Sequence, residues 1–295
     1  MTGPGTPVGD DPGAADPTAL RALAVEVAAE AAEFVHAGRP DRVEVAATKS
    51  SPTDVVTAMD TAAERLIAER LFAARSLDGF LGEESGHRAG GSGLTWIVDP
   101  IDGTVNYLYG IRAYAVSVAV VRDTSTPARA AGAEPPDPAT WEVLAGAVVD
   151  PAAGETWSAA LGGGSRLSTA AGDRALHATA GVDPAQALVA TGFGYDAARR
   201  AEQAAVVARL LPQVRDLRRI GTASLDLCSV AAGRVDAYYE RGLKAWDFAA
   251  ALLVATEAGV VVTGFAGGPA GPDGLLAAGT TLHPVLRSVL QDAGV

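Results

Sequence analysis

The chain has 295 residues, of which 48% are hydrophobic and 20% charged, a balance typical of globular proteins rather than disordered ones. Its formal net charge of −12 argues against direct nucleic-acid binding, which requires positive charge facing the phosphate backbone. The same charge does not exclude an anionic substrate, because bound cations reverse the local sign.

Residues 1–17 are rich in Gly, Pro and Asp and lack a basic start, which predicts a disordered tail rather than a signal peptide. Apolar residues then recur at helical spacing from Leu20 to Val35 and predict an amphipathic helix. That helix carries too many charges to span a bilayer, so we expect no membrane partner. The single cysteine, Cys228, cannot form an internal disulfide, which fits a cytoplasmic protein.

A second helix is predicted over residues 61–74, with Asp60 or Thr61 as its cap. A short strand over residues 80–85 follows this helix. The Gly-rich stretch 87–93 is expected to be flexible.

Strand-like runs occupy the middle of the chain, at residues 96–98, 115–121 and 144–149. The segment 124–140 holds four prolines and separates the last two of these runs. We predict an extended loop between two antiparallel strands there, because strand signals resume on both sides.

A domain boundary is predicted within residues 174–187, where small and polar residues precede a new strand-like run. We expect an N-terminal α+β domain over 18–180, with most of the candidate metal ligands, and a C-terminal α/β domain over 181–295. Strand and helix patterns alternate in the second domain, which is typical of an α/β fold. The predicted elements are strands over 188–193, 214–220 and 236–240 and helices over 198–211, 225–232 and 247–258.

Two carboxylates, Asp99 and Asp102, lie at the end of an apolar run, on a turn that contains Pro100 and Gly103. Pro100 disfavours helical geometry at Asp99 and Gly103 permits close backbone approach, so both carboxylates can point towards one site. Carboxylate oxygens are hard ligands, which favours Mg²⁺ or Mn²⁺ over Zn²⁺. A solvated turn is the alternative interpretation.

Further acidic pairs occupy the ends of predicted elements, next to Gly, Pro or Trp. They are Asp54 with Asp60, Glu83 with Glu84, and Glu240 with Asp247. Taken singly, each acid is explained by a helix cap or a solvated loop charge. Taken together with Asp99 and Asp102, they match a known pattern.

Three blocks of the sequence resemble the inositol monophosphatase family in order and spacing, and most of all its bacterial members. The blocks are residues 82–85, 96–106 and 246–250. The resemblance extends to residues 54–60, 218–226 and 231–240 and covers nearly the whole chain. It implies a layered αβαβα sandwich and a Mg²⁺-dependent, lithium-sensitive phosphomonoesterase that is commonly a homodimer.

The resemblance also implies which residues hold the metal ions. One ion is held by Glu83, Asp99 and the backbone carbonyl of Ile101, and a second by Asp99, Asp102 and Asp247. The physical chemistry agrees with this arrangement, because a phosphate dianion enters a nest of carboxylates only when divalent cations neutralise it.

No cysteine or histidine lies in the matched blocks, so a metal-activated water is a better nucleophile than a covalent phospho-enzyme. By resemblance, Glu83 and the hydroxyl of Thr104 orient and deprotonate this water. A weaker third metal ion involves Glu83 and, through water, Asp60.

For the phosphate monoester substrate, the resemblance implies contacts with a set of carboxylates, one hydroxyl and backbone amides. The residues are Asp102, Gly103, Thr104, Ala223, Glu240 and Asp247. Carboxylates and amides suit the vicinal hydroxyls of a polyol, although a strand-end charge is the alternative for Glu240. Lys49 and Lys244, the only lysines of the chain, are further candidates, and Lys244 stands where animal members have histidine.

Three positions, Arg112, Ala251 and Val260, depart from the family pattern without removing a candidate ligand. They leave substrate preference open. The first hypothesis is hydrolysis of inositol 1-phosphate. The alternatives of the same class are histidinol phosphate, fructose 1,6-bisphosphate, NADP and 3′-phosphoadenosine 5′-phosphate. A different class is a regulatory protein with incidental activity, which binds transcription factors through Arg199, Arg200, Arg215 or Arg218.

Overall fold

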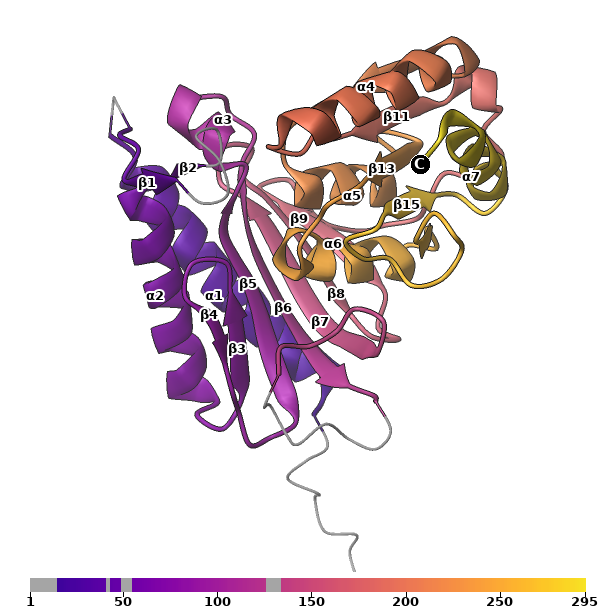
Figure 1. Ribbon diagram of the computed structural model, residues 1–295. Helices are drawn as coiled ribbons and strands as arrows, with labels where there is room; N and C mark the ends of the chain where they lie inside the picture. The colour runs from indigo at the N-terminus through magenta and orange to yellow at the C-terminus, as the bar shows by residue number, and fades with distance from the viewer. Residues whose placement is uncertain (1–14, 41–42, 49–54, 126–133) are drawn as a thin grey trace, which may run out of the picture.

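The computed structural model describes residues 15–40, 43–48, 55–125 and 134–295 and contains two large sheets covered by helices (Figure 1). The strand order is β10-β9-β8-β7-β6-β5-β3-β4 in the larger sheet and β12-β11-β13-β15-β14 in the smaller one. Helices α1 and α2 cover the outer face of the larger sheet, α5 and α6 lie between the sheets, and α4 and α7 cover the smaller sheet. The predicted αβαβα layering is confirmed.

The larger sheet uses strands from the first part of the chain. They are β3 (Gly79–Gly82), β4 (Gly86–Arg88), β5 (Leu94–Asp102), β6 (Ala115–Asp123), β7 (Trp141–Asp150), β8 (Glu155–Ala160), β9 (Ser165–Thr169) and β10 (Gly172–Ala175). Strands β5 to β10 form an antiparallel meander, whereas β3 pairs with β5 in parallel. A small separate hairpin consists of β1 (Ala47–Thr48) and β2 (Val55–Val56).

The smaller sheet uses strands from the last part of the chain. They are β11 (Leu188–Thr191), β12 (Asp216–Arg218), β13 (Ala237–Glu240), β14 (Val261–Thr263) and β15 (Leu275–Ala278). The helices are α1 (Pro17–Ala37), α2 (Ala58–Ala74), α3 (Thr104–Tyr109), α4 (Ala197–Leu210), α5 (Ala223–Ala231), α6 (Ala245–Glu257) and α7 (Leu282–Ala293), with short 3₁₀ turns η1 (Pro184–Gln186) and η2 (Leu211–Gln213).

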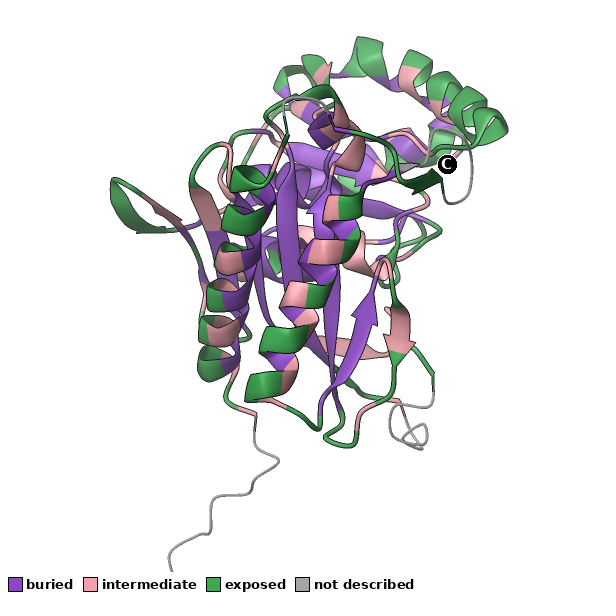
Figure 2. Cartoon of the chain, turned by 90° about the vertical axis from the view of Figure 1, so that its left-hand side faces the viewer, coloured by how far each residue is buried: buried purple, intermediate pink, exposed green. Residues whose placement is uncertain are grey.

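All residues of α5 and most residues of α6 are buried because each helix packs against both sheets, whereas α1 and α2 expose one face to solvent (Figure 2). Small residues bring α6 close to the larger sheet. A Cβ on Gly146 of β7 would lie 2.8 Å from the Cα of Ala250, so only glycine permits this approach. One hydrophobic core contains Ile97 and Trp157 of the larger sheet and Tyr238 of the smaller one. The proposed division into two domains therefore stays a prediction.

Several predicted boundaries were wrong. Helix α2 begins at Ala58, because Thr57 rather than Asp60 or Thr61 occupies the cap position. The strand predicted over 214–220 comprises only Asp216–Arg218, and part of the stretch predicted to be flexible forms β4. Strands β8 to β10 were not predicted. The antiparallel pairing of β6 with β7 across the segment 124–140 is confirmed.

Some predictions fall outside the described residues. Lys49 and Asp54 are among them, as are residues 1–14 of the predicted tail and residues 126–133 of the predicted loop. Helix α1 already begins at Pro17, and Asp16 caps it by accepting a hydrogen bond from the backbone of Thr18. None of the described helices combines the length and the apolar character that crossing a bilayer requires.

Candidate active site

A cavity of about 520 Å³ lies where the carboxyl end of β5 meets the first turns of α5 and α6. The structure brings most of the predicted site residues together on its walls. These are Glu83, Asp99, Ile101, Asp102, Gly103, Thr104, Ala223, Glu240, Lys244 and Asp247. Asp60 is fully buried behind this wall, where its Oδ1 lies 3.1 Å from the hydroxyl of Thr104.

The turn after β5 is held in place by its own side chains. The pairing of β5 with β6 shifts register between Asp99 and Asp102, so the strand is irregular at this point. Asp99 Oδ1 accepts a hydrogen bond of 3.0 Å from the backbone N–H of Ile101. Gly103 follows with φ of 92°, a left-handed conformation that favours glycine, and Thr104 then begins α3.

Asp102 connects the two halves of the cavity. Its Oδ2 accepts hydrogen bonds from the hydroxyls of Thr222 and Ser224 and, at 2.8 Å, from the backbone N–H of Ser224. Burial raises the pKa of Asp102, although these hydrogen bonds oppose the shift. The start of α5 is thereby fixed to the end of β5.

Asp247 lies in the first turn of α6 and contributes a further carboxylate to the cavity wall. The backbone N–H of Lys244 donates a hydrogen bond of 2.6 Å to Asp247 Oδ2. Burial and the charge of Glu83 hold the pKa of Asp247 well above its usual range. The Lys244 side chain itself is exposed at the edge of the cavity.

The four carboxylates Glu83, Asp99, Asp102 and Asp247 repel one another. Burial first, and then the charges of the other three, hold the pKa of Asp99 well above its usual range. Among the described residues, no three His, Cys, Asp or Glu side chains already stand in cation-binding geometry. The available donors are carboxylate oxygens and the carbonyl of Ile101, a set that fits a hard divalent cation, which would also relieve the repulsion.

Thr104 connects the turn that carries Asp99 and Asp102 to Asp60. Its hydroxyl lies 3.0 Å from the carbonyl of Ile101 and 3.1 Å from Asp60 Oδ1. The backbone N–H and the hydroxyl of Thr57 donate to the other oxygen of Asp60. Asp60 therefore positions Thr104, and its role towards a third metal ion stays a prediction.

Glu240 lies at the end of β13, away from the other carboxylates. Tyr238 donates its hydroxyl hydrogen to Glu240 Oε2 over 2.6 Å. Burial raises the pKa of Glu240 to about 7, while the Tyr238 hydrogen bond and the charge of Arg219 oppose the shift. A Cβ on Gly192 would lie only 1.9 Å from Glu240 Oε2, so glycine at this position leaves room for the carboxylate.

Replacing Gly192 with alanine is expected to displace Glu240 and to lower kcat/KM for a polyol phosphate about tenfold or more. The overlap should also lower the free energy of unfolding by about 1–3 kcal/mol. Steady-state kinetics and thermal denaturation measure both effects. Gly91→Ala is the matched control, because a Cβ there meets nothing within 4 Å. An unchanged kcat/KM in Gly192→Ala would show that turnover of the polyol phosphate does not depend on the position of Glu240.

Sequence reasoning did not select three further residues that line the cavity, Arg199, Arg219 and Asp226. Arg219 and Asp226 lie inside a block matched to the family, which was the available signal. Arg199 was assigned to an exposed binding surface, and it is exposed, but its guanidinium also packs against Gly242, where a Cβ would lie only 2.3 Å away from it. Arg218 instead pairs with Asp216.

The departures from the family pattern lie away from the cavity. Ala251 and Val260 are buried, and Arg112 is exposed. None of the three lines the cavity. The three departures therefore leave the four cavity carboxylates unchanged.

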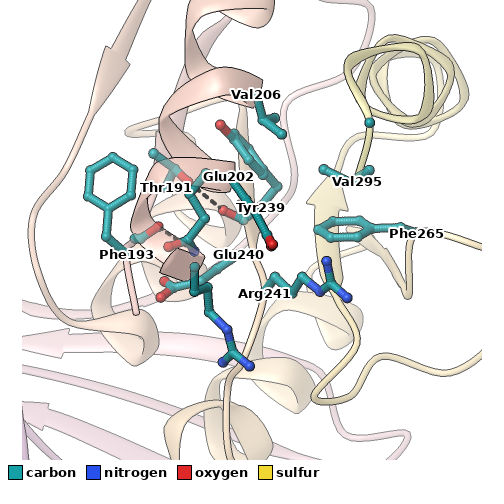
Figure 3. A pocket seen from close by; sticks show the side chains of 13 residues that line it. Thr191, Phe193, Glu202, Val206, Tyr239, Glu240, Arg241, Phe265 and Val295 are labelled. Carbon is teal, nitrogen blue, oxygen red and sulfur yellow. Dashed lines mark hydrogen bonds between the residues drawn. The ribbon is translucent and has the colours of Figure 1, made fainter. Parts of the chain in front are cut away.

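A second cavity of about 300 Å³ adjoins the first on the α4 side of the smaller sheet (Figure 3). Its walls include Tyr239 and Phe265, and it shares Arg199 and Glu240 with the first cavity. Strand β11 pairs in parallel with both β12 and β13, so the two strands that follow it in the chain lie on opposite sides of it. Both cavities open at the carboxyl ends of β11 and β13, where α/β sheets commonly bind ligands.

Comparison with known proteins agrees with this geometry. The model of the inositol monophosphatase family matches residues 16–294. The chain belongs to the inositol monophosphatase family. An inositol-1-monophosphatase of Mycobacterium leprae (strain TN) is 45% identical over an alignment of 295 positions, which covers 94% of this chain and 94% of that one. Membership of the family makes this protein an enzyme, a phosphatase that hydrolyses phosphate monoesters.

Two further relatives extend the comparison. The solved structure of Mycobacterium tuberculosis SuhB is 42% identical, with a TM-score of 0.75, and the match covers 95% of this chain and 98% of that one. A protein of Pasteurella multocida (strain Pm70) named Nus factor SuhB is 35% identical over 248 residues, 83% of this chain and 85% of its own length. The family therefore includes relatives named as inositol-1-monophosphatases and others named as Nus factors.

Proposed function

We propose that this phosphatase hydrolyses inositol 1-phosphate to inositol and inorganic phosphate in a Mg²⁺-dependent reaction with water as the nucleophile. The observation that carries the proposal is the group of four carboxylates, the buried Asp99 and Asp102 with the partly exposed Glu83 and Asp247, in a cavity that also contains Glu240. A phosphate dianion is repelled from such a group until cations neutralise it.

The proposed metal ligands are Glu83, Asp99, Asp102, Asp247 and the carbonyl of Ile101. Mg²⁺, or Mn²⁺ as a substitute, supplies the positive charge that attracts the phosphate and acidifies the attacking water. Glu83 accepts a proton from this water, and the Thr104 hydroxyl, positioned by Asp60, orients it. The backbone of Gly103 and Thr104 faces the phosphate.

The leaving alcohol is proposed to lie on the opposite side, against Glu240 and the backbone of Ala223. Inositol presents vicinal hydroxyls, which donate hydrogen bonds to a carboxylate and accept them from N–H groups. The name and 45% identity of the Mycobacterium leprae relative support this choice of alcohol.

A phosphate-release panel tests the substrate. We expect kcat/KM for inositol 1-phosphate to exceed that for histidinol phosphate, fructose 1,6-bisphosphate, NADP and 3′-phosphoadenosine 5′-phosphate in the presence of Mg²⁺. Parallel assays with Li⁺ measure the proposed lithium sensitivity. A tenfold preference for histidinol phosphate or a nucleotide would contradict the proposed substrate but not the phosphatase class.

A regulatory role is the second candidate, because the Pasteurella multocida relative carries the name Nus factor. Of the arginines considered for such a surface, Arg215 bonds to Gln186 and Arg218 to Asp216, whereas Arg199 lines the active cavity. Expressing an Asp99→Asn variant in cells that lack the protein separates the roles. Rescue by this variant would favour regulation, and failure to rescue would favour catalysis.

Homodimer formation and a cytoplasmic location complete the proposal. Both rest on the resemblance to the family. Sedimentation of the purified full chain measures the first, and fractionation of cells measures the second.

A further inference from the structure

Asp226 differs from the other buried acids of this protein. The others each accept at least one hydrogen bond; they are Asp60, Glu64, Asp78, Asp99, Asp102 and Asp150. Asp226 is 1% exposed, and its Oδ1 has no hydrogen-bond partner among the described residues. Burying a carboxyl group without partners is costly, so the residue requires an explanation beyond folding.

Asp226 is an acidic residue in a helix that is buried along its whole length. Every residue of α5 is buried, because the helix lies between the two sheets (Figure 1). An apolar side chain at position 226 would suit this setting better than a carboxyl group. The backbone N–H of Asp226 bonds to the carbonyl of Thr222 in the first turn of the helix.

Asp226 lines the active cavity together with Glu240 and Ala223, the residues proposed to contact the alcohol. Its nearest charged neighbours in electrostatic terms are Glu240, Asp102 and Arg219. Arg219 already supplies positive charge here, since its guanidinium packs against Gly221 and lowers the pKa of both Asp226 and Glu240. A ligand at this wall of the cavity is therefore expected to offer neutral hydrogen-bond donors rather than another positive charge.

We propose that Asp226 is a specificity-determining residue that, beside Glu240, hydrogen-bonds hydroxyl groups of a polyol in the alcohol part of the substrate. The inference rests on the proposed function and adds a second carboxyl group to the alcohol subsite. Burial raises the pKa of Asp226 to about 8 and that of Glu240 to about 7, so part of this wall is uncharged at neutral pH. An uncharged carboxyl group both donates and accepts, as a hydroxyl does.

Asp226→Leu tests the proposal, because leucine removes the hydrogen-bonding group and suits the buried helix. Inositol 1-phosphate and glycerol 2-phosphate serve as hydroxyl-bearing substrates, and p-nitrophenyl phosphate as one whose alcohol has no further hydroxyl. We expect the ratio of kcat/KM for the hydroxyl-bearing substrates to that for p-nitrophenyl phosphate to fall about tenfold or more, chiefly through KM. The melting temperature should not fall, since no hydrogen bond to Asp226 is lost.

Two companions complete the experiment. Asp226→Asn keeps one acceptor oxygen, so its ratio should fall less, about threefold. Ser229→Ala changes another buried polar residue of α5 that does not line the cavity, and its ratio should equal that of the wild type. If Asp226→Leu does not fold, the ratio for Asp226→Asn decides.

The results separate the possible roles. Equal losses on both substrate types, or a lower melting temperature with an unchanged ratio, would overturn the proposal and indicate a structural role. An unchanged KM for every substrate would overturn it as well. Failure of the wild type to cleave inositol 1-phosphate would defeat the proposed substrate alone, and glycerol 2-phosphate would then decide the role of Asp226.

Discussion

Replacing Asp99 with asparagine is expected to lower kcat for phosphate release by about 10³-fold or more, because one carboxylate then fails to hold the cations that stabilise the transition state. Asp99 is the residue on which the charges of Glu83, Asp102 and Asp247 converge. Asparagine keeps the shape and can still accept the hydrogen bond from the backbone of Ile101. Phosphate release at saturating Mg²⁺ and substrate measures the effect.

The same variant is expected to unfold at a higher temperature than the wild type when no divalent cation is present. The pKa of Asp99 is raised in the fold, so the folded protein holds a proton that the unfolded chain releases above about pH 4. Stability of the wild type therefore falls as pH rises from that value, whereas asparagine does not titrate. The advantage of Asp99→Asn should be absent near pH 3 and grow towards neutral pH.

Asp150→Asn provides the matched control for both measurements. Asp150 is also a buried aspartate, but it accepts hydrogen bonds from the backbone of Ala152 and Ala153 and lies outside the cavity. Its replacement should leave kcat unchanged and should stabilise the protein less than Asp99→Asn does, because hydrogen bonds from two backbone N–H groups oppose the rise that burial gives the pKa of Asp150. Activity of Asp99→Asn within tenfold of the wild type would contradict the assigned role of Asp99.

Removing divalent cations is expected to abolish turnover and to lower the stability of the wild type. Mg²⁺ at a hundred times its dissociation constant should raise the free energy of unfolding by about 2.7 kcal/mol per site, because it binds the four carboxylates only when the protein is folded. The increase should become smaller as pH is lowered, because protons compete with Mg²⁺ for carboxylates whose pKa is raised by burial and by neighbouring charges. Thermal denaturation after dialysis against EDTA, with and without added Mg²⁺, measures the effect.

Asp247→Asn and a NaCl solution of equal ionic strength serve as controls for the Mg²⁺ experiment. The Mg²⁺-dependent increase should be much smaller in Asp247→Asn, and NaCl should not reproduce it in the wild type. Full turnover in EDTA, or an equal stabilisation by NaCl, would show that no divalent cation occupies this site.

The order of the acidic blocks was sufficient to predict the active cavity, because each block carries its ligands at a strand end or a helix start. Asp99 and Asp102 follow the apolar run of β5, and Asp247 opens α6. Turn residues such as Pro100 and Gly103 encode their local conformation directly, so this part of the site is readable from the chain. The layered fold followed from the same resemblance.

Boundaries and the short strands were less predictable, because tertiary contacts decide them. Thr57 became the cap of α2 through its bonds to Asp60, although three candidate capping residues stand close together. Strands β9 and β10 have mixed polar sequences and are stabilised mainly by pairing with neighbours. Local pattern carries little information about such pairing.

By itself the sequence determined the family and the layered fold and selected the carboxylates that are proposed to hold metal ions, because these depend on local motifs in a set order. Only the tertiary structure decided which of the other charged residues face the cavity. Asp102 meets Ser224 across 122 positions of the chain, and Asp226 and Arg199 reach the cavity from two different helices. Contacts of this kind depend on how helices pack between sheets. The spacing of residues along the chain does not specify that packing. The positions of Asp226 and Arg199 at the cavity are therefore decided by the fold.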